Sequence, residues 1–147
     1  MHKVYLGLGS NLGDRLGNMA EAIRLIGERI GSVTRQSSFI ETEPWGFESE
    51  NRFLNAVILC ETGWTPREVL RLTQQIEREL GKRKVHATQR RQIVNGKSPN
   101  CKYADRPIDI DILLYDDLTV DEPDLKIPHP LMHQRDFVMI PLKEIKD

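Results

Sequence analysis

The chain has few cysteines, no excess of one charge and no long apolar run. Cys60 and Cys101 are too few for a disulfide framework, and neither lies in a C-x-x-C pair. The net charge of −1 gives no general attraction to nucleic acid. No apolar stretch approaches the roughly 20 residues of a membrane span, and the N-terminus does not resemble a signal peptide. We therefore expect a cytoplasmic protein without a membrane partner.

The pattern along the chain predicts a single domain over residues 1–147. Strand-like and helix-like stretches alternate and end at turn residues. In chain order, we expect strands at 3–9, 33–41, 52–62 and 107–115, helices at 16–30 and 65–81, and a short extended segment and a helix at 122–145. The order βαββαβ predicts an α+β, ferredoxin-like sandwich, in which helices pack on an antiparallel sheet and the extra elements follow at the C-terminus.

The predicted helices have recognisable ends. Thr65 and Glu68 have the spacing of a capping box, and Pro66 suits the first helical position. Gly81 is expected to end this second helix. For the first helix, the candidate caps and the terminal glycine are, in order, Asn11, Asp14 and Gly31.

The glycine-rich stretch "GLGSNLG" (7–13) does not match the common nucleotide-binding loops. Its third glycine comes one residue too late for G-x-G-x-x-G, and the lysine of a P-loop is absent. A tight turn between strand and helix explains the stretch, with Ser10 and Asn11 satisfying backbone groups. This interpretation does not exclude Ser10 and Asn11 from also lining a site.

The stretch "RPIDIDILLYDD" (106–117) is the most informative in the sequence. Side chains of a strand alternate between faces, so Asp109 and Asp111 share one face and stand about 6–7 Å apart. We expect this face to continue with Leu113 and Tyr115. Two carboxylates this close repel each other unless a cation lies between them, and Mg²⁺ is the natural candidate. Taken alone, D-x-D is a weak signal, and a solvated strand end or a pair with Arg106 explains it equally well.

Basic residues surround the acidic pair in the sequence. The polar stretch from 82 to 105 contributes lysines and arginines, and a structureless stretch of this length is usually functional or disordered. His129, His133 and Arg135 follow the strand. Carboxylates for a metal and cations for phosphate are what phosphoryl transfer requires. A zinc site at the two histidines is the weaker alternative, because Pro130 disfavours a shared helical face and no cysteine joins them.

Four stretches together resemble the 6-hydroxymethyl-7,8-dihydropterin pyrophosphokinases of folate synthesis. They are "YLGLGSNLGDR", "FLNAV", "RPIDIDILLYDD" and "PHPLMHQRDFVMIPL", and the resemblance runs from about residue 5 to residue 145. The pattern R-x-x-D-x-D-x-x-x-[FY] followed by P-H-x-x-[ML]-x-x-R-x-F is highly specific. The resemblance implies a ferredoxin-like fold and transfer of pyrophosphate from ATP to the hydroxymethyl group of the pterin, with release of AMP.

The resemblance also implies a role for individual residues. Asp109 and Asp111 would hold two Mg²⁺ ions, with Lys82, Arg83 and Arg106 as the other catalytic residues. The residues implied around ATP are Leu70, Gln74, Glu77, Lys84, Ile112, Leu125, Lys126, His129 and Arg135. Those implied around the pterin are Thr42, Trp45, Phe53, Asn55 and Phe137. Core packing of Phe53 and Phe137, and a solvated helix face for Gln74 and Glu77, are the plainer interpretations.

The sequence departs from the family pattern at three places. Gly81-Lys82-Arg83 replaces the usual Gly-Arg, which leaves open whether Lys82 or Arg83 contacts phosphate. The loop up to Asp105 is longer than in many relatives, and Pro130 stands where some have tyrosine. A non-catalytic nucleotide-binding module and a metal-dependent phosphohydrolase are the alternative functions. We expect small-molecule substrates only, and a monomer, with a weak dimer as the alternative.

Overall fold

The computed structural model describes residues 1–42, 52–85 and 107–146. The elements run in the order β1 (His2–Ser10), α1 (Arg15–Arg29), β2 (Ser32–Gln36), β3 (Ile40–Thr42), β4 (Phe53–Thr62), α2 (Pro66–Val85), β5 (Asp109–Tyr115), β6 (Val120–Glu122), β7 (Leu125–Ile127), η1 (Met132–Gln134, a 3₁₀ turn) and α4 (Asp136–Ile145). Within the described ranges, no helix combines the length and hydropathy that a membrane span requires.

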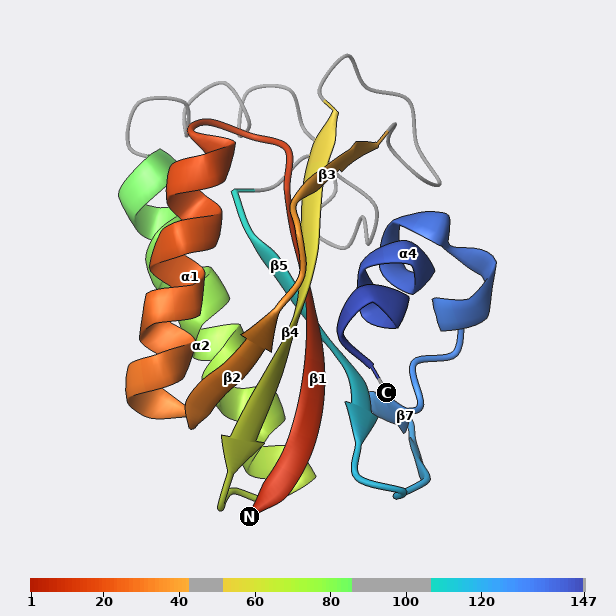
Figure 1. Cartoon of the computed structure of the whole chain (residues 1–147). Coiled ribbons are helices and arrows are strands. Elements are labelled where there is room, and N and C mark those ends of the chain that lie inside the picture. Colours follow the sequence, from red (N-terminus) through yellow and green to blue (C-terminus); the bar gives the residue numbers. More distant parts are fainter. Residues whose placement is uncertain (43–51, 86–106, 147) are drawn as a thin grey trace.

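The strands form an antiparallel sheet in the order β2–β4–β1–β5, and β3 pairs with β4 on the same side as β2. Helices α1 and α2 cover one face of the sheet, and α4 lies on the other (Figure 1). The connections β1–α1–β2 and β4–α2–β5 are the two interleaved units of a ferredoxin-like fold. The expected α+β architecture is therefore confirmed.

The sheet is buried on both faces, because two separate apolar clusters use alternate residues of its strands. In β4, Ala56, Ile58 and Cys60 belong to the cluster with α1 and α2. Val57 and Leu59 belong to the cluster with α4. Burial on both faces explains why this segment reads as a continuous apolar run rather than an alternating pattern.

The face assignment of β5 is partly different from expectation. Ile110 and Ile112 point toward α1 and α2, and Leu113 packs on the α4 side, as predicted. The pairing of β5 with β1 then shifts by one residue. This bulge turns Tyr115 to the α1–α2 side, where it is fully buried and its hydroxyl donates to the carbonyl of Trp64. The expectation that Tyr115 shares a face with the aspartates is wrong, because strict alternation holds only within an unbroken ladder.

The expected strand at 33–41 is divided into β2 and β3 by a short irregular segment. Ser37 maintains the connection to β4 across the break: its N–H donates to the Val57 carbonyl at 2.9 Å, and its Oγ accepts from the Val57 N–H at 2.9 Å. A side-chain hydroxyl thus replaces one ladder bond. At the next residue, Ser38 donates from its N–H and Oγ to the Glu144 carboxylate of α4.

The helix ends follow the predicted signals, with one exception. Asp14 caps α1 by accepting from the Gly17 N–H at 3.1 Å. Thr65 and Glu68 form the reciprocal capping box of α2. Gly81 does not end this helix, which continues to Val85. A single glycine costs a helix only about 1 kcal/mol relative to alanine, so it weakens a helix without stopping it.

Gly31 and Gly27 provide a matched test of backbone packing. A Cβ added at Gly31 would lie 2.0 Å from the Glu61 carbonyl oxygen, whereas one at Gly27 would meet nothing within 4 Å. We expect Gly31→Ala to lower the free energy of unfolding by about 1–3 kcal/mol, and Gly27→Ala to raise it by roughly 0.5–1 kcal/mol. Urea unfolding of both variants measures the difference. Equal changes in the free energy of unfolding for the two variants would show that the β4 backbone at Glu61 moves easily to accommodate a methyl group at residue 31.

Asp116 supplies a test of pH dependence. It has a positive φ of 48°, and its carboxylate accepts from the Lys3 N–H and the His2 ring, both at 2.7 Å. Partial desolvation opposes these two hydrogen bonds, but the net effect is that the pKa of Asp116 is lowered from about 3.8. The charged form therefore stabilises the fold above this value, and the contribution is lost as the pH falls through the lower folded pKa.

We expect Asp116→Asn to be less stable than the parent at neutral pH, and this difference in stability to shrink as the pH falls below about 3.8. Asparagine tolerates the positive φ, so backbone strain does not confuse the comparison. Unfolding midpoints across this pH range provide the measurement. A stability difference between the parent and Asp116→Asn that does not change with pH would contradict the lowered pKa of Asp116.

Candidate active site

Strand β1 lies between β4 and β5, the strand that carries Asp109 and Asp111. It has glycines at two positions that pair with residues of both neighbours. Gly9 pairs with Asn55 of β4 on one side and with Asp109 of β5 on the other. Gly7 likewise pairs with Val57 and Asp111. Paired residues share a face, so Asn55, Gly9 and Asp109 form one row, with the outer Cα atoms about 10 Å apart. The middle of this row has no side chain.

The two glycines are candidate site positions that the sequence analysis did not single out. A Cβ at Gly9 would lie 3.1 Å from Asn55 Oδ1 and 3.4 Å from a ring carbon of Phe53. At Gly7 it would lie 3.3 Å from the Leu113 side chain. The stretch "YLGLG" indicates this feature, because glycines two residues apart in a strand leave one of its faces bare, that is, without side chains of its own.

Asn55 is held in place at the edge of this bare face. Its side chain is 3% exposed, and Nδ2 donates to Thr42 Oγ1 of β3 at 2.7 Å. Its Oδ1 lies on the Gly9 side. Phe53, half-buried, begins β4 on the same face. Three of the residues implied for a pterin site, Thr42, Phe53 and Asn55, are thus brought together.

Helix α4 brings the second aromatic residue to this face of the sheet. The helix packs against β4 and β3. Phe137, near its start, is half-buried against the apolar cluster on the α4 side. Arg135 immediately precedes the helix, is 6% exposed, and holds its guanidinium carbon 5.5 Å from the centre of the Phe137 ring. This cation–π contact ties the position of Arg135 to that of Phe137.

The acidic pair lies on the outer strand, next to a third carboxylate. Asp109 and Asp111 are half-buried. Glu77 of α2 accepts at 2.7 Å from the N–H of Ile110, the residue between them. Among the described residues, no group of three or more histidine, cysteine or acidic side chains is arranged as a metal site. Two strand carboxylates nevertheless suit Mg²⁺, which is commonly held by one or two carboxylates and completes its shell with substrate phosphates.

The residues implied around ATP gather at the β5 side of the sheet. Ile112 and Leu125 are buried in the cluster with α1 and α2, and Leu70 packs against it. Gln74 is exposed on α2. Lys126 pairs with Asp121 at 2.5 Å. The backbone of His129 lies beside β5, and its N–H donates to the Leu113 carbonyl at 3.1 Å.

Several expected site residues lie outside the described part of the structure. They are Trp45, Arg106 and the side chains of Lys82, Arg83 and Lys84. The described candidate residues come from different elements of the fold. The candidate pterin residues come from β3, β4 and α4. Most of the candidate nucleotide residues come from α2, β5 and β7, but His129 follows β7 and Arg135 lies beside Phe137 at the start of α4.

Comparison with known proteins shows the family of the chain. The family model for 7,8-dihydro-6-hydroxymethylpterin-pyrophosphokinase matches residues 5–147. A 2-amino-4-hydroxy-6-hydroxymethyldihydropteridine pyrophosphokinase of Porphyromonas gingivalis is 48% identical over 143 residues, covering 97% of this chain and 89% of that protein. The corresponding protein of Aquifex aeolicus is 38% identical over 146 residues, covering 99% and 81%.

A solved structure supports the fold independently of sequence. The HPPK-DHPS protein of Plasmodium falciparum superposes with a TM-score of 0.68 at 15% identity, covering 99% of this chain and 40% of that longer chain. At this identity the likeness concerns the fold. With the full-length match of the family model, it follows that the chain belongs to the 7,8-dihydro-6-hydroxymethylpterin-pyrophosphokinase family, a family of pyrophosphate-transferring enzymes.

Proposed function

We propose that this chain transfers the β,γ-pyrophosphoryl group of ATP to 6-hydroxymethyl-7,8-dihydropterin, in a step of folate synthesis. Family membership supports the reaction class. The observation that carries the proposal is the row Asn55–Gly9–Asp109, in which a hydrogen-bonding amide and a metal-type carboxylate flank a bare strip of sheet. A flat ring can lie against such a strip and present its substituent to the acids.

The pterin would bind on the β4 side of the row. Phe53 and Phe137 would stack on its two faces, since offset stacking suits a flat heterocycle. Asn55 would hydrogen-bond the polar edge of the ring, an arrangement that accounts for a buried amide in an apolar strand. Thr42 fixes that amide, and Trp45 would complete the ring's surroundings.

The phosphates would bind on the β5 side. Asp109 and Asp111 would hold two Mg²⁺ ions, which supply charge neutralisation of the phosphates and a lower pKa for the attacking hydroxyl. Glu77 anchors the backbone between the aspartates and so fixes their separation. We assign the remaining phosphate contacts to Lys82, Arg83, Arg106, His129 and Arg135. The adenosine would be held by Leu70, Gln74, Lys84, Ile112, Leu125 and Lys126.

The chemistry of the step is an in-line displacement. A bond forms between the hydroxymethyl oxygen and the β-phosphorus, and the bond from that phosphorus to the bridging oxygen breaks, so AMP leaves with this oxygen. The hydroxyl proton passes to solvent. The chain's contribution is to position the two substrates and exclude water, and no side chain is assigned as a dedicated general base.

We further propose a cytoplasmic monomer that binds neither nucleic acid nor a membrane, in keeping with its balanced charge. The first experiment supplies purified protein with ATP, Mg²⁺ and the pterin, and follows AMP. One AMP per pterin diphosphate, and none without pterin, supports the proposal. AMP release without pterin would instead identify the phosphohydrolase alternative.

Asp111 tests the acidic pair. We expect Asp111→Asn to lower kcat by about 100-fold or more, since charge stabilisation by a held metal contributes several kcal/mol to the transition state. Asp117→Asn, at an exposed position beyond the same strand, is the matched control and should keep parental turnover. Equal kcat for the two variants in the AMP assay would remove Asp111 from the metal site.

Asn55 tests the pterin side and should separate activity from stability. Asn55→Leu keeps the volume but removes the amide, and we expect the pterin KM to rise about tenfold, the equivalent of one lost hydrogen bond of about 1.4 kcal/mol. The melting temperature should change little, because burial of an apolar side chain offsets the loss of the hydrogen bond to the half-buried Thr42. An unchanged pterin KM would contradict the assignment.

A further inference from the structure

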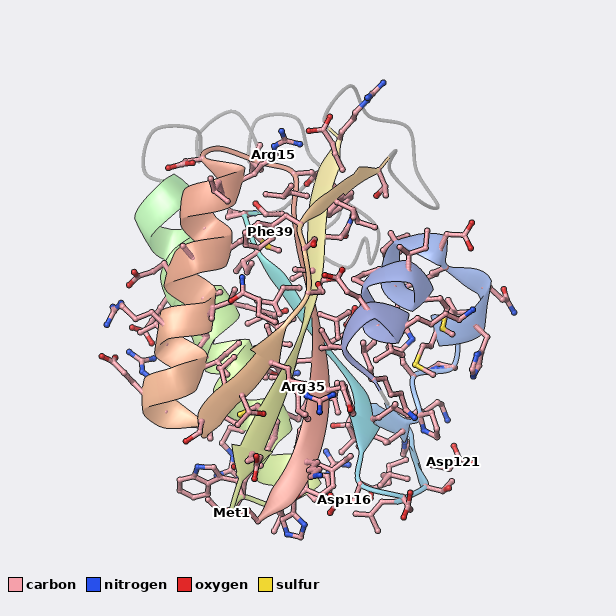
Figure 2. All side chains as sticks on the ribbon, viewed as in Figure 1. Met1, Arg15, Arg35, Phe39, Asp116 and Asp121 are labelled. Carbon is pink, nitrogen blue, oxygen red and sulfur yellow. The ribbon has the colours of Figure 1, made fainter. Side chains whose placement is uncertain are left out.

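We infer that Arg15 is a positioning residue for the pterin side of the site, acting from the opposite face of the sheet. The inference rests on the proposed function. Arg15 is the first residue of α1. Figure 2 shows it at the end of the sheet where β3 and β4 meet, near the start of the helix. It lies on the helix-covered side, so it does not contact the bare strip itself.

The Arg15 side chain joins the two strand ends that flank segment 43–51. One guanidinium nitrogen, Nη2, donates to Glu41 Oε2 of β3 at 2.8 Å. The other, Nη1, donates at 2.9 Å to the backbone carbonyl of Arg52, which directly precedes β4. The planar fork of arginine makes both bonds at once, a geometry that a lysine cannot reproduce. The Arg52 guanidinium adds a longer contact of 3.6 Å to Glu41.

We call the contact of Arg15 with Glu41 and the Arg52 carbonyl the clamp. The residues next to it are those proposed to hold the pterin. Glu41 precedes Thr42, and Arg52 precedes Phe53. Thr42 and Phe53 are paired across the ladder. Neighbouring residues of a strand point to opposite faces, so the clamp sits behind the same backbone that presents Thr42 and Phe53 to the ring.

Besides the Arg15 contacts, strand β3 is held by its ladder with β4 and by packing against α4. It has three residues, Ile40–Thr42, and pairs only with β4 in the described sheet. A strand this short makes a weak ladder. Thr42 in turn fixes the Asn55 amide. Removal of the Arg15 guanidinium should therefore loosen Thr42 and Phe53 together and displace the Asn55 amide. Strand β5 is separated from β4 by β1, so Asp109 and Asp111 should keep their positions.

The clamp is half-exposed, so its contribution to global stability should be small. The side chains of Arg15 and Glu41 are 33% and 42% exposed, and exposed ion pairs stabilise a fold little. This property makes the inference testable, because substrate binding can change while the fold remains intact.

The experiment compares Arg15→Met, Arg15→Lys and Glu41→Gln with the parent in the AMP assay, varying ATP and pterin separately. We expect Arg15→Met to raise the pterin KM about five- to tenfold, the scale of losing one ordinary hydrogen bond at a partly exposed position, with the ATP KM unchanged. Arg15→Lys should recover part of the loss. Glu41→Gln should show a smaller increase, since the amide oxygen still accepts.

Arg24→Met is the matched control. Arg24 lies on the same helix and pairs with Glu21 and Glu28 of that helix, away from β3. It should leave both KM values at the parental level. Melting temperatures of all variants show whether enough folded enzyme is present for the comparison.

The outcomes separate this inference from the proposed function. An inactive parent protein would overturn the proposed function before any variant is considered. With an active parent, a pterin KM unchanged in Arg15→Met, or an equal rise of both KM values, would overturn the role of Arg15. A selective rise in the pterin KM, partly restored by lysine, would establish it.

Discussion

The antiparallel pairing of β1 with both β4 and β5 is the constraint on which the rest of the structure depends. It aligns residues 9, 55 and 109, which are far apart in the chain, in one row across the sheet. Because β1 is central, both of its faces are covered, and at Gly7 and Gly9 the neighbouring Leu113, Asn55 and Phe53 approach its backbone closely. The candidate site therefore lies where β1 contributes no side chain of its own, between strands that the two buried apolar clusters stabilise.

Much of the architecture could be predicted from local patterns. The helix caps at Asp14 and Thr65, and the aspartate alternation in β5, depend on residues within one turn or one strand, and the structure confirms them. The bulge that turns Tyr115 to the other face could not be predicted, because its cause is distant: the tyrosine hydroxyl reaches the Trp64 carbonyl, and its ring fills the main core. The break at Ser37 likewise depends on Val57 of a partner strand.

The candidate site shows the same division between local and distant information. The acidic pair and Asn55 stand out in the sequence, since a carboxylate or an amide within an apolar strand needs a reason. The Arg15–Glu41 contact joins residues 26 positions apart with no periodic relation, and only the folded chain brings them together. The placement of Phe53 and Asn55 on one side of β1 and of Asp109 and Asp111 on the other also becomes visible only from the strand order.

The outer edge of β5 has a consequence for association between molecules. An edge strand normally presents free backbone groups that another strand can recruit. Here the Ile110 N–H donates to the Glu77 carboxylate, and the Leu113 carbonyl accepts from the backbone N–H of His129. A strand from a second molecule could not bond to these groups without displacing the protein's own contacts. The carboxylate that steadies the acidic strand thus also shields it from edge-to-edge aggregation.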